Sequence, residues 1–101
     1  MLGPVRWFHS PTGNIECELR STSAYCQTFK PFRHVVLRTN GRLAQCKGEL
    51  CVGNGPTSAT TLAYGASVVV WPFRCTSLRS GMRCLVHGHG FLLSRSGVKR
   101  L

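Results

Sequence analysis

The sequence predicts an all-β fold, specifically a small antiparallel sandwich or barrel that is built of hairpins and stapled by disulfides. No window of about 11 residues has helical periodicity, whereas short β-branched and aromatic runs alternate with turn residues about every ten positions. The six cysteines are an even number in a short chain, as in disulfide-rich domains. A chain of 101 residues buries one modest core, so we treat residues 1–101 as a single β domain.

Each expected strand is a short run rich in β-branched or aromatic residues and bounded by turn formers. The dipeptide Asn40-Gly41 favours a hairpin with a two-residue type I′ turn, because both of its residues tolerate a positive φ. Residues 52–60 have no apolar period and many turn formers, which indicates a surface loop. The expected strands are residues 5–9, 15–19, 24–28, 35–39, 43–47, 67–70, 73–77, 82–87 and 91–94.

The cysteine spacing favours disulfides formed in an oxidising place. Folding residues 16–27 and 74–85 back on themselves puts the two cysteines of each segment opposite one another, at a separation that a disulfide can span. Structural zinc is the alternative, but it usually requires closer pairs such as C-x2-C, which do not occur here. We therefore expect three sequential disulfides, with no metal and no cofactor. The pairs are Cys17 with Cys26, Cys46 with Cys51, and Cys75 with Cys84.

The charge balance favours an anionic partner. The only acidic residues are Glu16, Glu18 and Glu49, and the formal net charge is +10 at neutral pH. A field of this sign attracts nucleic acid, an acidic protein surface or an anionic envelope polymer. The alternative is a solvated surface whose charge maintains solubility.

Neither a signal peptide nor a transmembrane stretch is expected from the sequence. Residues 1–7 lack a charged start followed by an apolar run, and the apolar run at 66–73 is interrupted and too short to span a bilayer. We therefore expect no membrane insertion. Two histories fit the cysteines: a domain cut from a secreted precursor, or a chain made in a cytoplasm and oxidised after release.

No residue pattern points to catalysis. Glu16 and Glu18 flank Cys17, so on a strand both point to the face opposite that cysteine, which we expect to be solvated. His87 and His89 share a face if the strand continues through Gly88, but a third metal ligand is not evident. With the cysteines paired, no thiolate is left as a nucleophile. We expect no catalytic residues and a protein that is not an enzyme.

Arginines alternate with aromatic residues in three segments, which is typical of protein interfaces. The same composition occurs in proteins that stack single-stranded bases, and aromatic residues are more often simply core. We take an interface with an acidic partner as the leading hypothesis. The candidate partner-binding residues are Arg6, Trp7, Arg33, Trp71, Arg74, Arg79 and Arg83.

Five segments of the sequence follow one another in a characteristic order: residues 10–17, 62–65, 72–77, 80–84 and 88–95. This series resembles a group of small cysteine-paired domains of uncharacterised function. These domains occur in secreted or lipoprotein-like actinobacterial proteins and in virion proteins of the phages that infect those bacteria. The similarity runs from about Phe8 to Val98. It implies a non-enzymatic extracellular or virion module in which the first and last cysteine pairs bridge strands.

Two departures from the bacterial members favour the phage branch: the missing signal peptide and the short middle pair, Cys46 and Cys51. The leading hypothesis is therefore a virion structural protein, a minor tail or decoration subunit. Its expected partners are other virion proteins, in a homo- or hetero-oligomeric assembly. The alternatives are a secreted envelope-binding module and, less favoured, a sequence-independent nucleic-acid binder.

Overall fold

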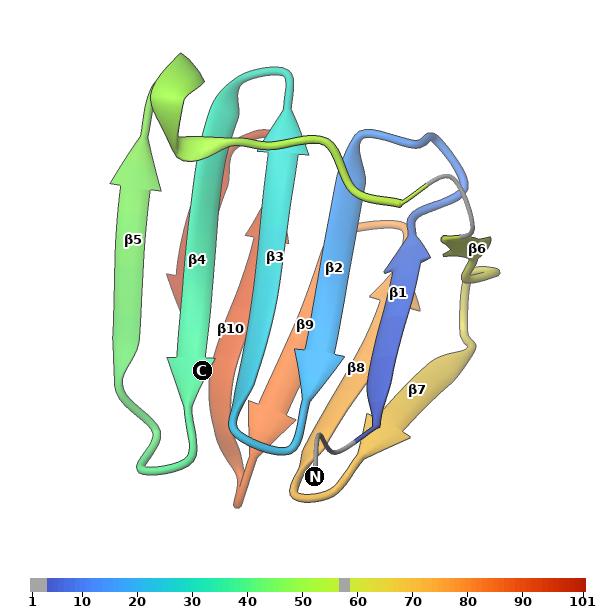
Figure 1. Ribbon diagram of the computed structural model, residues 1–101, viewed down its shortest axis with the longest axis vertical. Coiled ribbons are helices and arrows are strands. Elements are labelled where there is room, and N and C mark those ends of the chain that lie inside the picture. The colour runs from blue at the N-terminus through green and yellow to red at the C-terminus, as the bar shows by residue number, and fades with distance from the viewer. Residues whose placement is uncertain (1–3, 57–58) are drawn as a thin grey trace.

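The computed structural model describes residues 4–56 and 59–101. Two β-sheets pack face to face as a sandwich, which confirms the predicted all-β class (Figure 1). Most neighbouring strands are antiparallel and consecutive in sequence, so the sheets are built largely of hairpins. No helix in this part of the chain has the length and apolarity that a membrane crossing requires.

Sheet A is the front layer in Figure 1, with strand order β5-β4-β3-β2-β1-β6. Its strands are β1 (Val5–His9), β2 (Ile15–Arg20), β3 (Ser23–Phe29), β4 (Phe32–Arg38), β5 (Leu43–Lys47) and β6 (Thr60–Thr61). Sheet B lies behind it, with order β11-β10-β9-β8-β7. Its strands are β7 (Ser67–Val70), β8 (Phe73–Leu78), β9 (Gly81–Val86), β10 (His89–Ser94) and β11 (Gly97–Arg100). A 3-10 helix, η1 (Glu49–Cys51), follows β5.

All of the expected strands are present, and the bounds of β1, β5 and β7 agree at both ends. Three elements were not expected: β6, β11 and η1. β6 has two residues and pairs in parallel with β1, so no local pattern could signal it. β11 is short and mostly polar, and it completes a hairpin with β10.

The predicted hairpin at Asn40-Gly41 is confirmed, but the predicted type I′ turn is wrong. The loop has one more residue, because the Gly41 amide donates to Arg38 O at 2.9 Å and the Arg38 amide donates to Arg42 O at 2.9 Å. Only Gly41 has a positive φ, and Asn40 Oδ1 instead accepts from the Arg42 amide at 3.0 Å. A type I turn followed by a bulged glycine needs only one residue with positive φ.

A two-residue turn with positive φ at both positions does occur, at His87-Gly88. The φ angles are 48° and 82°, and Val86 pairs directly with His89. The strand therefore ends before His87 and does not continue through Gly88. His87 lies in the turn and His89 opens the next strand, so the expected shared face of the two imidazoles is not formed.

The segment after η1 crosses the outer face of sheet A from β4 towards β2 (Figure 1). We call residues 51–55 the strap. The predicted loop at 52–60 is irregular as far as residue 56, residues 57–58 lie outside the described residues, and Thr60 belongs to β6. The loop is therefore not merely a surface connection, because its first part covers a sheet face.

The core is formed by alternate residues of the strands that point between the sheets. Phe8 comes from sheet A and Phe73 and Phe91 from sheet B, and each is at most 1% exposed. Leucine, valine and methionine side chains fill the space around them. Apolar burial of this kind, at roughly 25 cal/mol per Å², is the main force holding the layers together.

All three predicted disulfides are present, with no free cysteine. Two of them join directly opposed residues of neighbouring strands, with Cα atoms 4.1 Å apart in each case. On a chain-entropy model, each such closed loop contributes roughly 2–3 kcal/mol by restricting the unfolded chain. The pairs are Cys17–Cys26 across β2 and β3, Cys75–Cys84 across β8 and β9, and Cys46–Cys51 between β5 and η1.

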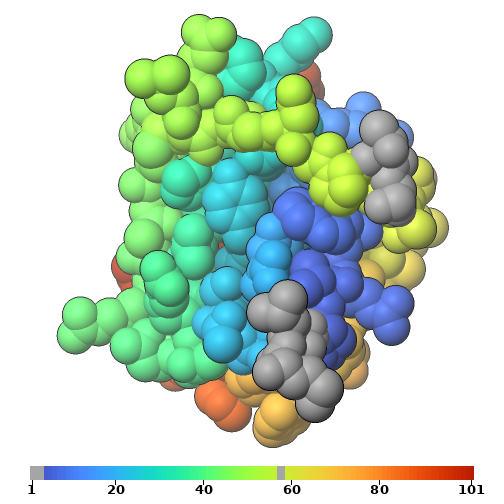
Figure 2. All heavy atoms as spheres, in the orientation of Figure 1, coloured from blue at the N-terminus to red at the C-terminus, as the bar shows by residue number. Residues whose placement is uncertain are grey.

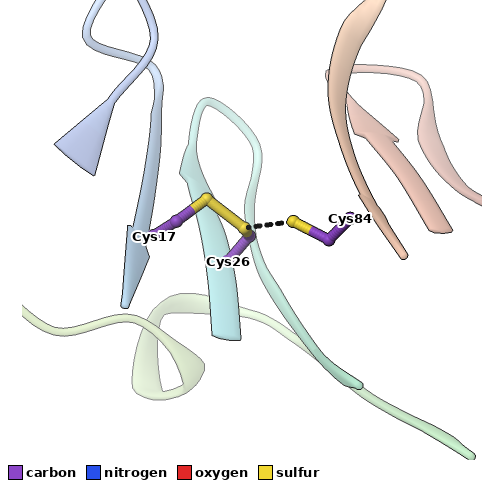
Figure 3. Close-up of side chains that lie close together, drawn as sticks. All are labelled: Cys17, Cys26 and Cys84. Carbon is purple, nitrogen blue, oxygen red and sulfur yellow. Dashed lines mark hydrogen bonds between the residues drawn. A yellow bond between two sulfur atoms is a disulfide. The ribbon is translucent and has the colours of Figure 1, made fainter. Parts of the chain in front are cut away.

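The two cross-strand disulfides meet in the centre of the sandwich, one from each sheet. Cys26 Sγ lies 3.7 Å from Cys84 Sγ (Figure 3). Cys17 completes a group of three buried sulfur atoms within 4.8 Å of one another. These sulfurs belong to disulfides and carry no thiolate, so the group is a packing contact and does not offer a metal site.

Candidate protein interface

The outer face of sheet B is open and carries cations. Arg74 lies between buried Phe73 and Cys75 on β8, so its side chain points away from the core. The same alternation turns Arg83 and Lys99 outward from β9 and β11. We call this surface the basic face.

Apolar side chains lie between these cations. Arg74 is paired across the strands with Leu85, and Leu92 lies between Arg83 and Lys99 in the ladder. Val69 opposes Arg74 from the edge strand β7 and is 51% exposed. A surface that combines arginines with apolar side chains is more typical of protein interfaces than of plain solvated surface.

No carboxylate side chain lies on sheet B, because the last acidic residue of the sequence is Glu49. The single ion pair among the described residues joins Arg20 to Glu18 on sheet A. The cations of the basic face therefore have no acidic partner within the described chain. Their field attracts an acidic surface and opposes a basic one.

The seven candidate partner-binding residues do not form one surface. Arg74 and Arg83 lie on the basic face, and Arg79 lies in the turn between β8 and β9. Trp71 lies in the turn between β7 and β8, is 77% exposed, and meets the His87 ring edge-on at 6.2 Å between ring centroids.

The other three candidates lie elsewhere. Trp7 and Arg6 are neighbours on β1 and point to opposite faces, although both line one hollow between β1 and β7. Arg33 is half-buried, with its guanidinium close to Gly97 and its Nε lacking a hydrogen-bond partner among the described residues. The seven residues therefore lie on more than one surface of the sandwich.

Lys99 was missed, although it completes the basic face. The expected strands ended at residue 94, so the alternation in residues 97–100 was not used. In Gly97-Val98-Lys99-Arg100, Val98 packs against the core and the next residue, Lys99, is exposed, so an apolar residue is followed by a cation on the opposite face. That alternation was the available signal.

The strap crosses the upper part of the outer face of sheet A (Figure 2) and is hydrogen-bonded to it. The Gln27 side chain donates to Gly53 O at 2.6 Å and accepts from the Gly53 amide at 3.2 Å. The Tyr25 hydroxyl donates to Gln27 Oε1 at 2.7 Å, and His34 Nδ1 lies 2.6 Å from Cys51 O. The strap therefore uses the polar side chains of this face for folding.

Glu16 and Glu18 do lie opposite Cys17, as predicted, but the face is not simply solvated. They line a hollow of about 370 Å³ with Tyr25. One Glu16 oxygen is buried without a hydrogen-bond partner among the described residues, and Glu18 is paired with Arg20. Burial raises the pKa of Tyr25 above its ordinary value of 10.0, and Glu18 and Glu16 raise it further by repelling the phenolate.

Comparison with protein-family models, with curated proteins and with solved structures found no match.

Proposed function

We propose that this protein is a non-enzymatic virion structural protein, a minor tail or decoration subunit, that docks through its basic face onto an acidic surface of a neighbouring virion protein. The observation that carries the docking proposal is an open sheet face with Arg74, Arg83 and Lys99 and no carboxylate side chain. The virion assignment rests on the family resemblance and on the short middle pair, Cys46 and Cys51, which favours the phage branch.

The charge distribution supports a directed contact. The acidic side chains belong to β2 and η1, on the side of sheet A, whereas sheet B presents cations alone. An acidic partner is therefore repelled by carboxylates on the side of sheet A, whereas on sheet B it meets only cations that attract it. Complementary charge of this kind guides encounter and orientation more than it sets affinity.

The chemistry of the side chains supports a non-enzymatic role. Every cysteine is in a disulfide, so no thiolate is available to attack a substrate. Of the paired carboxylates, Glu18 is held by Arg20 and Glu16 lies beneath the strap near Gly55. Among the described residues, neither carboxylate is hydrogen-bonded to a histidine that could relay a proton.

The test is zero-length cross-linking of intact virions from a phage that encodes this chain, followed by mass spectrometry. Such a reagent joins a lysine amine directly to a carboxylate, and the lysines report on three different regions. Lys99 belongs to the basic face, Lys47 to the exposed edge strand β5, and Lys30 to the turn between β3 and β4. We expect a stoichiometric copy of the chain, with Lys99 joined to an aspartate or glutamate of another virion protein.

Virions without a stoichiometric copy would overturn the virion assignment, and a secreted envelope-binding module would then lead. A stoichiometric copy whose cross-links involve Lys47 but not Lys99 would overturn the basic face as the docking surface. Release of the chain from virions together with DNA, at a salt concentration that leaves the protein shell intact, would instead favour nucleic-acid binding.

A further inference from the structure

A cleft of about 620 Å³ opens at the end of the sandwich where β1, β3, β8 and β10 end, the upper end in Figure 1. Turns and strand ends from both sheets surround it, and its lining shares no cation with the basic face. We call it the end cleft. Its lining includes Lys30, Tyr64, Arg79, Ser80, Arg95 and Ser96.

The end cleft is cationic and contains no carboxylate. Lys30, Arg79 and Arg95 come from three different turns, between β3 and β4, between β8 and β9, and between β10 and β11. Three positive side chains that converge from separate turns repel one another, so the arrangement is favoured when an anion lies among them.

Two of the cations are held in place without being neutralised. Arg79 lies over the Tyr64 ring, 4.8 Å from its centroid. The loop that carries Tyr64 is fixed to β8, because the Gly65 amide donates to Ser77 O at 2.7 Å. The Lys30 backbone is held at both of its polar groups by Asn14, at 2.9 and 3.1 Å. Preorganisation of this kind lowers the entropy lost on binding.

Hydroxyl groups lie beside the cations. The side chains of Tyr64, Ser80 and Ser96 line the cleft, and none of the three makes a hydrogen bond to another described residue. Each hydroxyl both donates and accepts, so together they match a ligand that is itself rich in hydroxyls. Arg79 occupies one face of the Tyr64 ring, which reduces the aromatic surface that this lining offers for stacking bases.

We infer that the end cleft binds an anionic carbohydrate, a hydroxyl-rich chain that bears sulfate, phosphate or carboxylate groups. The cations hold the acidic groups and the hydroxyls hold the sugar. This binding does not depend on the docking role of the basic face, because the two sets of residues are different.

The experiment is isothermal titration of the intact protein with dextran sulfate, with neutral dextran as the uncharged control. Arg79→Ser with Arg95→Ser should weaken dextran sulfate binding by about ten-fold or more. The matched control, Arg38→Ser with Arg42→Ser, removes the same charge from exposed positions of the hairpin between β4 and β5, outside both the end cleft and the basic face, and should change the affinity by less than about two-fold. Equal losses in the two variants would overturn the proposal, because binding would then follow net charge alone.

A second variant keeps the net charge. Tyr64→Ala releases the Arg79 guanidinium and should weaken binding by about three-fold or more. Because Arg79, Arg95 and Tyr64 are exposed, we expect these variants to fold, and thermal unfolding checks this. Unchanged affinity in folded Tyr64→Ala would contradict the role given to the preorganised arginine.

Two smaller probes separate the sugar from the bare anion. A hexose phosphate should bind about three-fold or more tightly than inorganic phosphate, because the hydroxyls of the cleft contact the sugar. Equal affinities would overturn the carbohydrate assignment and leave an anion site. A single-stranded oligonucleotide that bound more tightly than dextran sulfate, with the same dependence on Arg79, would overturn it in favour of nucleic acid.

Discussion

The outer faces of the two sheets differ in what their polar side chains contact. On sheet A, Gln27 and Tyr25 hydrogen-bond to one another and to the strap, and the carboxylates lie in or near the covered hollow. On sheet B, Arg74 and Lys99 point into solvent and make no ion pair with the described residues. A polar residue on a strand can therefore belong to folding or to binding, and its partners decide which.

Because of this difference, we expect that mutations can separate the stability of the protein from its binding. Changes on the covered face should destabilise the fold and leave binding intact, and changes on the basic face should do the reverse. The disulfides between the faces provide the reference for the largest effect on stability.

The largest effect is expected from the disulfides where the two sheets meet. Cys75→Ala with Cys84→Ala should lower the free energy of unfolding by about 2–5 kcal/mol. The surface disulfide Cys46–Cys51 closes a loop with a sequence separation of 5, and the core disulfide Cys75–Cys84 closes one with a separation of 9. Cys46→Ala with Cys51→Ala opens the surface loop but removes no buried sulfur from the core. The surface variant should therefore lose less, because it leaves no cavity.

Urea unfolding of the two variants measures this difference. Their ratio is the informative quantity, because both lose a closed loop and only one loses core contacts. A surface variant that is as destabilised as the core variant would show that the contact between Cys26 and Cys84 adds nothing to the joining of the sheets.

A smaller effect is expected where the strap meets sheet A. Gln27→Ala removes both hydrogen bonds to Gly53 and the acceptor for the Tyr25 hydroxyl, which should cost about 1–2 kcal/mol. Arg74→Ala on the basic face should change stability by less than about 0.5 kcal/mol. Chemical denaturation compares the two, and equal destabilisation would contradict the division between a folding face and a binding face.

The smallest effect is a pH dependence that arises from the covered face. The pKa of Tyr25 is raised in the folded protein, so the folded state holds this proton more tightly than the unfolded chain does. The resulting stability is present below pH 10.0 and is lost as the pH rises from there through the higher folded pKa. The fall should be shallower in Tyr25→Phe, and unfolding measured along an alkaline series tests it. An identical pH profile in the two proteins would contradict the raised pKa of Tyr25.

The sequence was sufficient for nine of the eleven described strands and for the disulfides, because these depend on local patterns. Cys17 and Cys26, for example, are brought together by one hairpin, whose alternation and turn residues lie in the intervening segment. The turn at His87-Gly88 was missed because the strand pattern continues on both sides of it, and because His-Gly is not among the dipeptides that usually mark a two-residue hairpin turn.

The faces could be predicted less well, because they depend on contacts between distant residues. Gln27 and Gly53 are 26 positions apart, and no local pattern links them. Arg6 and Trp7 illustrate a different limit, since adjacent strand residues point to opposite faces however suitable both are for binding. Grouping candidates by composition alone therefore joined residues that strand geometry separates.

The most direct test of the docking role is the affinity of the protein for polyglutamate, used as a mimic of an acidic protein surface. The basic-face variant carries Arg74→Ser, Arg83→Ser and Lys99→Ser. Its matched control, Arg38→Ser with Arg42→Ser and Lys47→Ser, removes the same charges from exposed positions on sheet A and its hairpin. We expect the basic-face variant to lose about ten-fold in affinity and the control about two-fold or less. Equal losses, or a greater loss in the control, would contradict the basic face as the docking surface.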